Sequence, residues 1–161
     1  MTTEAELVKF AVPFVKATMH VLKTMAAISP APGTPYIKKT LIAQGDVSAI
    51  IGFTGDMAGS VSFSFTKRCA IGIVKNMLGD AIEDIMTDSR DAVGEISNMI
   101  SGQARAGILL DMGVKIAGST PSIIFGDNHT ICHMTKAAIV AIPFDSPHGP
   151  FTIEICIERI A

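Results

Sequence analysis

The clearest pattern in the sequence is a stretch of apolar residues at helical spacing between Asp91 and Met112. At 100° per residue, one side of this helix carries Val93, Ile96, Ile100, Ala104 and Gly107. The opposite side carries Asp91, Glu95, Asn98, Gly102 and Arg105. The pattern predicts a helix over residues 88–112 that ends at Gly113. Its outward stripe is unusual, because most exposed helix faces are covered by lysine and glutamate.

Helical spacing also marks two other segments. Thr3 and Glu6 have the spacing of a capping box, and apolar residues follow at helical intervals as far as Met25. Pro13 lies inside this pattern, which indicates either a kink or a helix that begins there. A further helix is predicted from Thr66, as N-cap, to about residue 78.

Alternation of apolar and polar residues predicts the strands. In residues 59–65, Val61, Phe63 and Phe65 alternate with serines, which is typical of a half-buried antiparallel strand. Other strands are predicted at residues 36–43, 47–53, 114–117, 122–125, 130–143 and 151–160. The expected fold class is α+β: an antiparallel sheet of about six strands, with long helices packed on it and one face covered.

A weak internal repeat accompanies these elements. Thr34-Pro-Tyr-Ile37 and Thr120-Pro-Ser-Ile123 each follow a long helix and precede about three strands. The sequence therefore indicates a degenerate duplication.

Composition narrows the class of protein. The 161 residues are 48% hydrophobic and 17% charged, which suggests one domain whose surface is partly covered by a partner subunit. The longest apolar run, residues 137–144, is too short to span a bilayer, and the N-terminus lacks signal-peptide features. We therefore expect a cytoplasmic protein without membrane contact. A net charge of −2 and scattered basic residues argue against nucleic-acid binding.

The cysteines and histidines offer a competing site. Three cysteines without framework spacing are expected to be reduced thiols. His129, Cys132 and His133 invite a metal interpretation, but Cys132 and His133 would point to opposite faces of a strand. We predict no metal site.

Glu95 and Asn98 are the candidate functional pair, because residues three apart on a helix stand next to each other. Gly94, Ser101 and Gly102 flank them with small side chains, although a mid-helix glycine costs about 1 kcal/mol relative to alanine. This conflict with helix propensity suggests a surface that another molecule approaches closely. The alternative is an ordinary solvated face. For Asp91 the alternative is helix-dipole support after an N-cap within residues 87–89.

An asparagine at such a site can hold a water molecule, because its amide both donates and accepts hydrogen bonds. Phosphoryl transfer depends mainly on alignment and charge stabilisation, so it can use a positioned water. The chain has no phosphate-cradling Gly-x-x-x-x-Gly-Lys loop, no Cys-x5-Arg arrangement and no acid cluster with metal-ligand spacing. Any cation for such chemistry must then come from the substrate.

The motif as a whole resembles the signature of the CheC, CheX and FliY family of chemotaxis phosphatases. That signature is an acid or serine, three residues, Glu, two residues, Asn, twenty-two residues and Pro, and it is matched by Asp91, Glu95, Asn98 and Pro121. The order of elements is similar to that of CheX. The resemblance therefore covers residues 1–161 as a single CheX-like domain.

The resemblance implies a phosphatase that accelerates hydrolysis of the aspartyl phosphate on a CheY-type response-regulator receiver domain. Asn98 would position the attacking water, and Glu95 would pair with a lysine of the receiver. Partner contacts are expected from Asp91, Gly94, Ser101 and Gly102. Pro121 would shape the surface after the helix.

The resemblance also implies a homodimer with one active site per subunit. No cofactor of its own is expected, and Mg²⁺ would be bound by the phosphorylated partner. The alternative is a non-catalytic module that binds a receiver or flagellar-switch component through the same helix.

Overall fold

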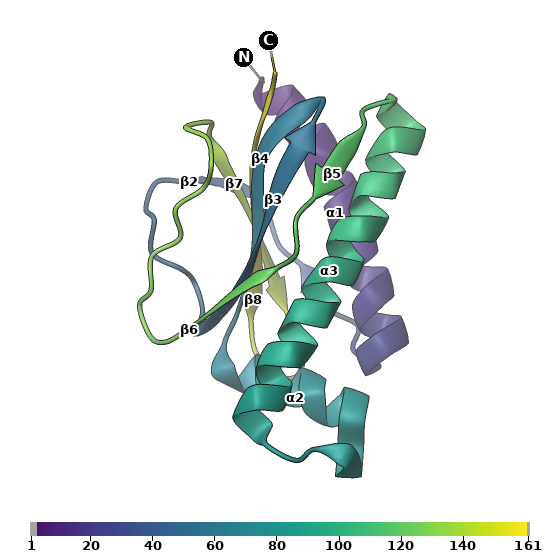
Figure 1. Ribbon diagram of the computed structural model, residues 1–161, viewed down its shortest axis with the longest axis vertical. Coiled ribbons are helices and arrows are strands. Elements are labelled where there is room, and N and C mark those ends of the chain that lie inside the picture. The colour runs from purple at the N-terminus through teal and green to yellow at the C-terminus, as the bar shows by residue number, and fades with distance from the viewer. Residues whose placement is uncertain (1–2, 161) are drawn as a thin grey trace.

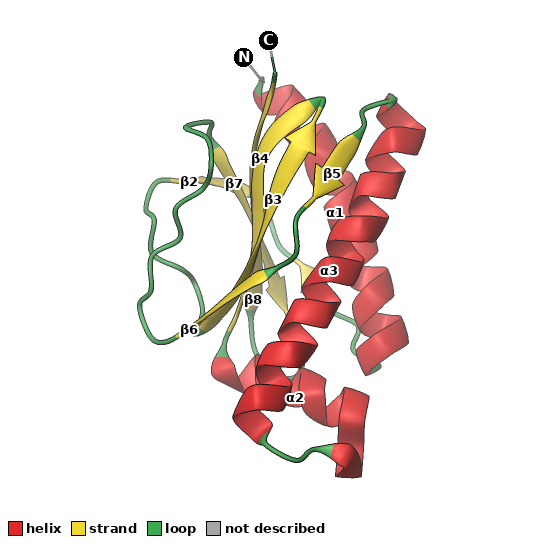
Figure 2. Ribbon diagram, viewed as in Figure 1, coloured by secondary structure: helices red, strands yellow, loops and turns green. Residues whose placement is uncertain are grey.

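The computed structural model describes residues 3–160, which form one antiparallel sheet with helices on one face (Figures 1 and 2). In chain order the elements are α1 (Glu4–Ala26), β1 (Ala31–Pro32), β2 (Tyr36–Lys38), β3 (Val47–Gly55), β4 (Met57–Phe65), α2 (Lys67–Leu78), η1 (Gly79–Ala81), α3 (Ile85–Met112), β5 (Ile116–Gly118), β6 (Ser122–Phe125), β7 (Ile139–Asp145) and β8 (Phe151–Arg159). The strand order is β1-β7-β8-β4-β3-β5, with β2 also paired to β7 and β6 to β3. The predicted α+β class is confirmed. The sheet has eight strands instead of about six, because short strands line both edges.

Helices α1 and α3 lie side by side over the sheet and enclose the apolar core (Figure 1). The capping box at Thr3 and Glu6 is formed, so α1 begins at Glu4 and Pro13 lies inside it. Pro13 is buried beside α3, where a Cβ added at Gly107 would lie 3.6 Å from the proline Cβ. The helix therefore does not begin at the proline. No helix within residues 3–160 combines the length and apolar character needed to cross a bilayer.

The other face of the sheet is also covered, which corrects the predicted one-sided burial. Ser60, Ser62 and Ser64 of β4 are as buried as the apolar residues between them. A loop of residues 126–138 lies over this face, on the side away from α1 and α3 (Figure 1). The predicted strand at 130–143 is therefore shorter, because only residues from Ile139 onward join the sheet.

Hydrogen bonds between polar side chains hold this loop to the sheet. His129 Nε2 lies 2.6 Å from Ser48 Oγ, and His133 Nδ1 lies 2.7 Å from Ser60 Oγ. His133 Nε2 lies 3.2 Å from a Glu154 carboxylate oxygen, whose other oxygen accepts a 2.6 Å hydrogen bond from Lys38 Nζ. These side chains form a buried polar layer, and the charged pair is 3% and 1% exposed.

The two halves of the chain have matching topology. Read from either edge of the sheet, β1 and β2 correspond to β5 and β6, β3 to β7, and β4 to β8. Helix α1 ends at Ala26 and α3 ends at Met112, and Thr34 and Thr120 follow at the same interval. The topology therefore agrees with the predicted internal duplication. Within the described residues, helix α2 has no counterpart in the first half.

Candidate functional site

Helix α3 carries the candidate pair, and its start is fixed by Asp84. The Asp84 side chain accepts hydrogen bonds from the backbone amides of Met86 and Thr87, so the helix begins at Ile85. The predicted N-cap within residues 87–89 is wrong, because Asp84 caps the helix and residues 87–89 already lie inside its first turns. Asp91 consequently lies beyond the first turn, where support of the helix dipole is weak.

The cap makes the stability of α3 sensitive to acid. Hydrogen bonds from the amides of Thr87 and Met86 hold the pKa of Asp84 below its usual value of 3.8. A carboxylate with a lowered folded-state pKa stabilises the fold above its unfolded-state pKa and loses this effect as the pH falls through the folded value. We expect Asp84→Ala to lower the melting temperature at pH 7, with a difference from wild type that shrinks below pH 3.8. Thermal unfolding of wild type and variant, followed by circular dichroism at pH 7 and below pH 3.8, measures this difference. Asp84→Ser, which keeps a neutral cap, should lose less at pH 7.

The outward face of α3 carries Asp91, Glu95 and Asn98, which we call the α3 ridge. All three side chains are exposed, and none makes a hydrogen bond or ion pair with another residue of the 3–160 range. The opposite side of the helix is anchored by apolar residues such as Ile96 and Ile100, both 0% exposed. The hydrophobic core therefore turns the ridge toward solvent.

The small residues around the ridge have different surroundings. A Cβ added at Gly94 would lie 3.4 Å from Ile123 Cδ1, so this glycine lets β6 pack closely against α3. At Gly102 the nearest atom would be 4.0 Å away, which leaves the surface beside Asn98 open. Ser101 is 0% exposed, and its Oγ has no hydrogen-bond partner among residues 3–160. The expected partner contact by Ser101 is therefore not available, because the β5–β6 side of the helix is covered.

Pro121 lies in the connection between β5 and β6, close in sequence to residues that tie this connection to the sheet. Ser119 donates its backbone N–H to the Gly52 carbonyl oxygen, and Ser119 Oγ accepts from the Gly52 N–H at 2.9 Å. Pro121 itself is half-buried. Its position next to this anchored segment is compatible with a shape-setting role.

Sequence reasoning assigned no role to Arg105, although it placed this residue on the outward side. In the structure Arg105 is half-buried, and its guanidinium fits against the backbone of Gly118. The sequence signal is faint, since it consists of a lone arginine in the second half of a helix and a glycine in the following strand.

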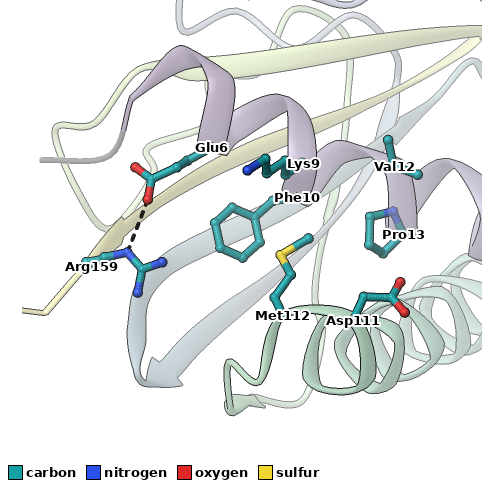
Figure 3. A pocket seen from close by; sticks show the side chains of 8 residues that line it. All are labelled: Glu6, Lys9, Phe10, Val12, Pro13, Asp111, Met112 and Arg159. Carbon is teal, nitrogen blue, oxygen red and sulfur yellow. Dashed lines mark hydrogen bonds and ion pairs between the residues drawn. The ribbon is translucent and has the colours of Figure 1, made fainter.

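A separate pocket of about 560 Å³ lies between the first half of α1, the end of α3 and β8 (Figure 3). Phe10 and Met112 contribute its apolar lining, and at its rim Arg159 Nε lies 3.4 Å from a Glu6 carboxylate oxygen.

In the duplicated topology, Lys9 and Val12 of α1 occupy the positions of Glu95 and Asn98. The first half therefore lacks a Glu-x-x-Asn pair.

The competing metal interpretation gains no geometric support. His129 and His133 bond to serines of the sheet, while Cys132 is exposed. No three His, Cys, Asp or Glu side chains gather as metal ligands in the described part of the chain. Burial raises the pKa of the Cys69 and Cys156 thiols, which makes them poor nucleophiles at neutral pH.

The α3 ridge has a definite chemical character. It presents an amide with free donors and acceptors beside a carboxylate, on an exposed helix face. Such a face is suited to entering a cleft of another protein, where Asn98 can hold a water molecule and Glu95 can pair with a cation.

Comparisons with known proteins agree on the family. The family model described as chemotaxis phosphatase CheX matches residues 47–145. The CheY-P phosphatase CheX of Thermotoga maritima is 26% identical over 106 residues, which is 65% of this chain and 68% of that protein. Among solved structures, a chemotaxis protein CheX from Desulfovibrio desulfuricans is 59% identical, with a TM-score of 0.87 over 93% of this chain and 99% of its own.

The fold is also that of a more distant protein. CheX of Borrelia burgdorferi, solved in complex with CheY, BeF3 and Mg²⁺, is 22% identical, with a TM-score of 0.74 over 93% of this chain and 98% of its own. The family match covers most of the chain, and the Desulfovibrio structure extends the likeness to nearly all of it. The protein therefore belongs to the CheX family of chemotaxis phosphatases.

Proposed function

We propose that this protein accelerates hydrolysis of the aspartyl phosphate on a CheY-type receiver domain. One observation carries the proposal: Glu95 and Asn98 stand side by side on an exposed helix face, and neither side chain is used within residues 3–160. The name of the Thermotoga relative and the CheY bound to the Borrelia protein support this choice of substrate.

The proposed mechanism divides the chemistry between two proteins. The receiver contributes its aspartyl phosphate, a bound Mg²⁺ and a lysine, and this chain contributes the α3 ridge. Asn98 enters the receiver's phosphorylation site and holds a water molecule in line with the scissile P–O bond. Glu95 pairs with the receiver's lysine and fixes the docked position. Asp91, Gly94 and Gly102 lie at the edge of this contact.

The assembly and location belong to the same proposal. We place the protein in the cytoplasm, where receiver domains act, as a homodimer with one α3 ridge per subunit. Exposed apolar residues on α1, among them Val8 and Val12, are compatible with a covering partner.

The decisive experiment measures loss of radiolabelled phosphate from a phosphorylated receiver domain in Mg²⁺, with and without this protein. A phosphatase should accelerate the loss at amounts far below the receiver concentration, because each molecule acts repeatedly. If the protein binds the phosphorylated receiver without accelerating hydrolysis, it is a binding module and the proposal is wrong.

Glu95→Ala is expected to lower kcat/KM for the phosphorylated receiver by about 10- to 100-fold, because a charge-assisted contact to the receiver's lysine is lost. Initial rates across receiver concentrations measure the change. Asp111→Ala is the control, because it removes an exposed carboxylate from the far end of the same helix; its kcat/KM should be unchanged from that of wild type. Equal losses in the two variants would mean that only the overall charge of α3 matters.

A further inference from the structure

Arg105 is held in a fixed position at the junction of α3 and β5. Its Nη1 donates a 3.4 Å hydrogen bond to the Ile116 carbonyl oxygen. A Cβ added at Gly118 would lie 3.1 Å from both Cζ and Nε of Arg105 and 3.3 Å from Nη2. The backbone of Gly118 is not in the left-handed region, so its conformation does not require glycine. The missing side chain instead makes room for the guanidinium.

The charge of this guanidinium is not neutralised within residues 3–160. The ion pairs found there join Lys38 and His133 to Glu154, and Arg159 to Glu6. Nε of Arg105 is buried without an acceptor, although an arginine carries five N–H donors and is always charged. A buried donor without a partner is unfavourable, so packing against Gly118 holds this cation in place although its Nε is unsatisfied.

The guanidinium lies on the approach to Asn98. Arg105 follows Asn98 by about two helical turns on the same side of α3, and long side chains lean toward the N-terminus of their helix. Its Nη2 lies 4.0 Å from the Cβ position of Gly102, which is one turn, about 5.4 Å, from Asn98. Because Gly102 has no side chain, nothing on α3 separates the cation from a molecule docked on Asn98.

Charge is therefore distributed unevenly along the docking face. Asp91 and Glu95 place carboxylates on the N-terminal side of Asn98, whereas Arg105 places a cation on the C-terminal side. A partner that offers a cation at one end and a carboxylate at the other fits in one orientation only, because the reversed orientation brings like charges together.

We infer that Arg105 is a specificity-determining docking residue that binds a carboxylate of the receiver domain. This inference rests on the proposed function and adds a second anchor to it. Glu95 engages the receiver's lysine on one side of Asn98, and Arg105 engages the carboxylate on the other side. Together they set the direction in which Asn98 enters. Arginine suits this role because its planar fork binds a carboxylate through two parallel hydrogen bonds.

The test compares KM and kcat for the phosphorylated receiver in Arg105→Met, Arg105→Lys and Gly118→Ala. In Arg105→Met we expect KM to rise about tenfold at low salt, with the effect on KM and not on kcat, and a weaker dependence of KM on ionic strength. Arg105→Lys should recover part of the salt dependence, because it keeps the charge but not the fork. Arg68→Met is the control, because it removes an exposed arginine from α2; its KM should be unchanged from that of wild type.

Gly118→Ala tests the geometry from the other side of the contact. The added methyl group displaces the guanidinium, so KM should rise as in Arg105→Met. In the Arg105→Met background the same substitution should have no further effect, since the displaced group is already absent. Melting temperatures of all variants identify any general loss of stability.

Two results of the kinetic test overturn the inference. In one, Arg105→Met has the KM of wild type. In the other, it loses kcat and melting temperature while the salt dependence of KM is unchanged, so that Arg105 only supports β5. If the wild type does not accelerate phosphate loss, the proposed function fails first. Binding of a receiver domain loaded with Mg²⁺ and beryllium fluoride, measured by calorimetry, then decides the docking role. Tenfold weaker binding by Arg105→Met supports it, and equal binding or no wild-type binding overturns it.

Discussion

Asn98→Ala is expected to lower the rate of receiver dephosphorylation by about 30- to 900-fold at saturating receiver, which corresponds to 2–4 kcal/mol in the barrier. The reason is that water placement acts in the transition state, so its loss affects kcat. Asn98 is exposed and makes no hydrogen bond to another residue of the 3–160 range, so its removal leaves no buried group unpaired. Alanine also has the higher helix propensity, so the variant should be at least as stable as wild type.

Two measurements separate this effect from its alternatives. Binding of the phosphorylated receiver to Asn98→Ala, measured by calorimetry, should change little. Gln103→Ala removes an exposed amide from the same helix, away from the α3 ridge, and should keep the wild-type rate. A wild-type rate in Asn98→Ala would refute the assigned role, and weakened binding without a change in kcat would make Asn98 a docking residue.

Glu154→Ala is expected to destabilise the protein by about 3–5 kcal/mol, because it leaves the Lys38 ammonium buried without its counter-charge. Lys38 Nζ lies 2.6 Å from the Glu154 carboxylate, and both side chains are almost completely buried. The variant also removes the acceptor of His133 Nε2 and so weakens the attachment of the loop at residues 126–138. Unfolding in urea measures the change in free energy.

Glu158→Ala provides the matched control, because it removes a carboxylate from a less buried position on the same strand. It should cost less than about 1 kcal/mol. The double variant Lys38→Met/Glu154→Leu should be more stable than Glu154→Ala, since no buried charge remains. If Glu154→Ala cost no more than Glu158→Ala, the loop would have to be open to water in solution.

Local sequence patterns were sufficient to predict that helices α1, α2 and α3 exist and which side of α3 forms the ridge. The 3.6-residue period alone places Ile96 inward and Asn98 outward, and the core confirms both positions. The start of α3 was predicted wrongly, within residues 87–89, because several suitable capping side chains, Asp84 among them, stand close together there. Only the hydrogen bonds of Asp84 distinguish them.

Long-range pairing accounts for what the sequence did not predict. The serines of β4 alternate as they would on a solvated face, yet they are buried by a polar loop from far along the chain. Ser101 was placed on the accessible side, but β5 and β6 cover that flank of α3. Nothing in a helical period indicates which flank a later strand will cover. Arg105 was overlooked for the same reason, because its contact with Gly118 joins two elements.

The duplicated topology has a consequence for how the ridge is maintained. Each half of the chain gives its short edge strands to the other half, because β1 and β2 pair with β7 while β5 and β6 pair with β3. Neither repeat can complete its own hydrogen-bond ladder, because a fragment cut between α2 and α3 keeps only the β3–β4 or the β7–β8 hairpin of the sheet. An isolated two-stranded hairpin is marginally stable at best in water. Formation and loss of the fold are therefore expected to be all-or-none, and Glu95 and Asn98 are held in register only while both halves of the molecule are present.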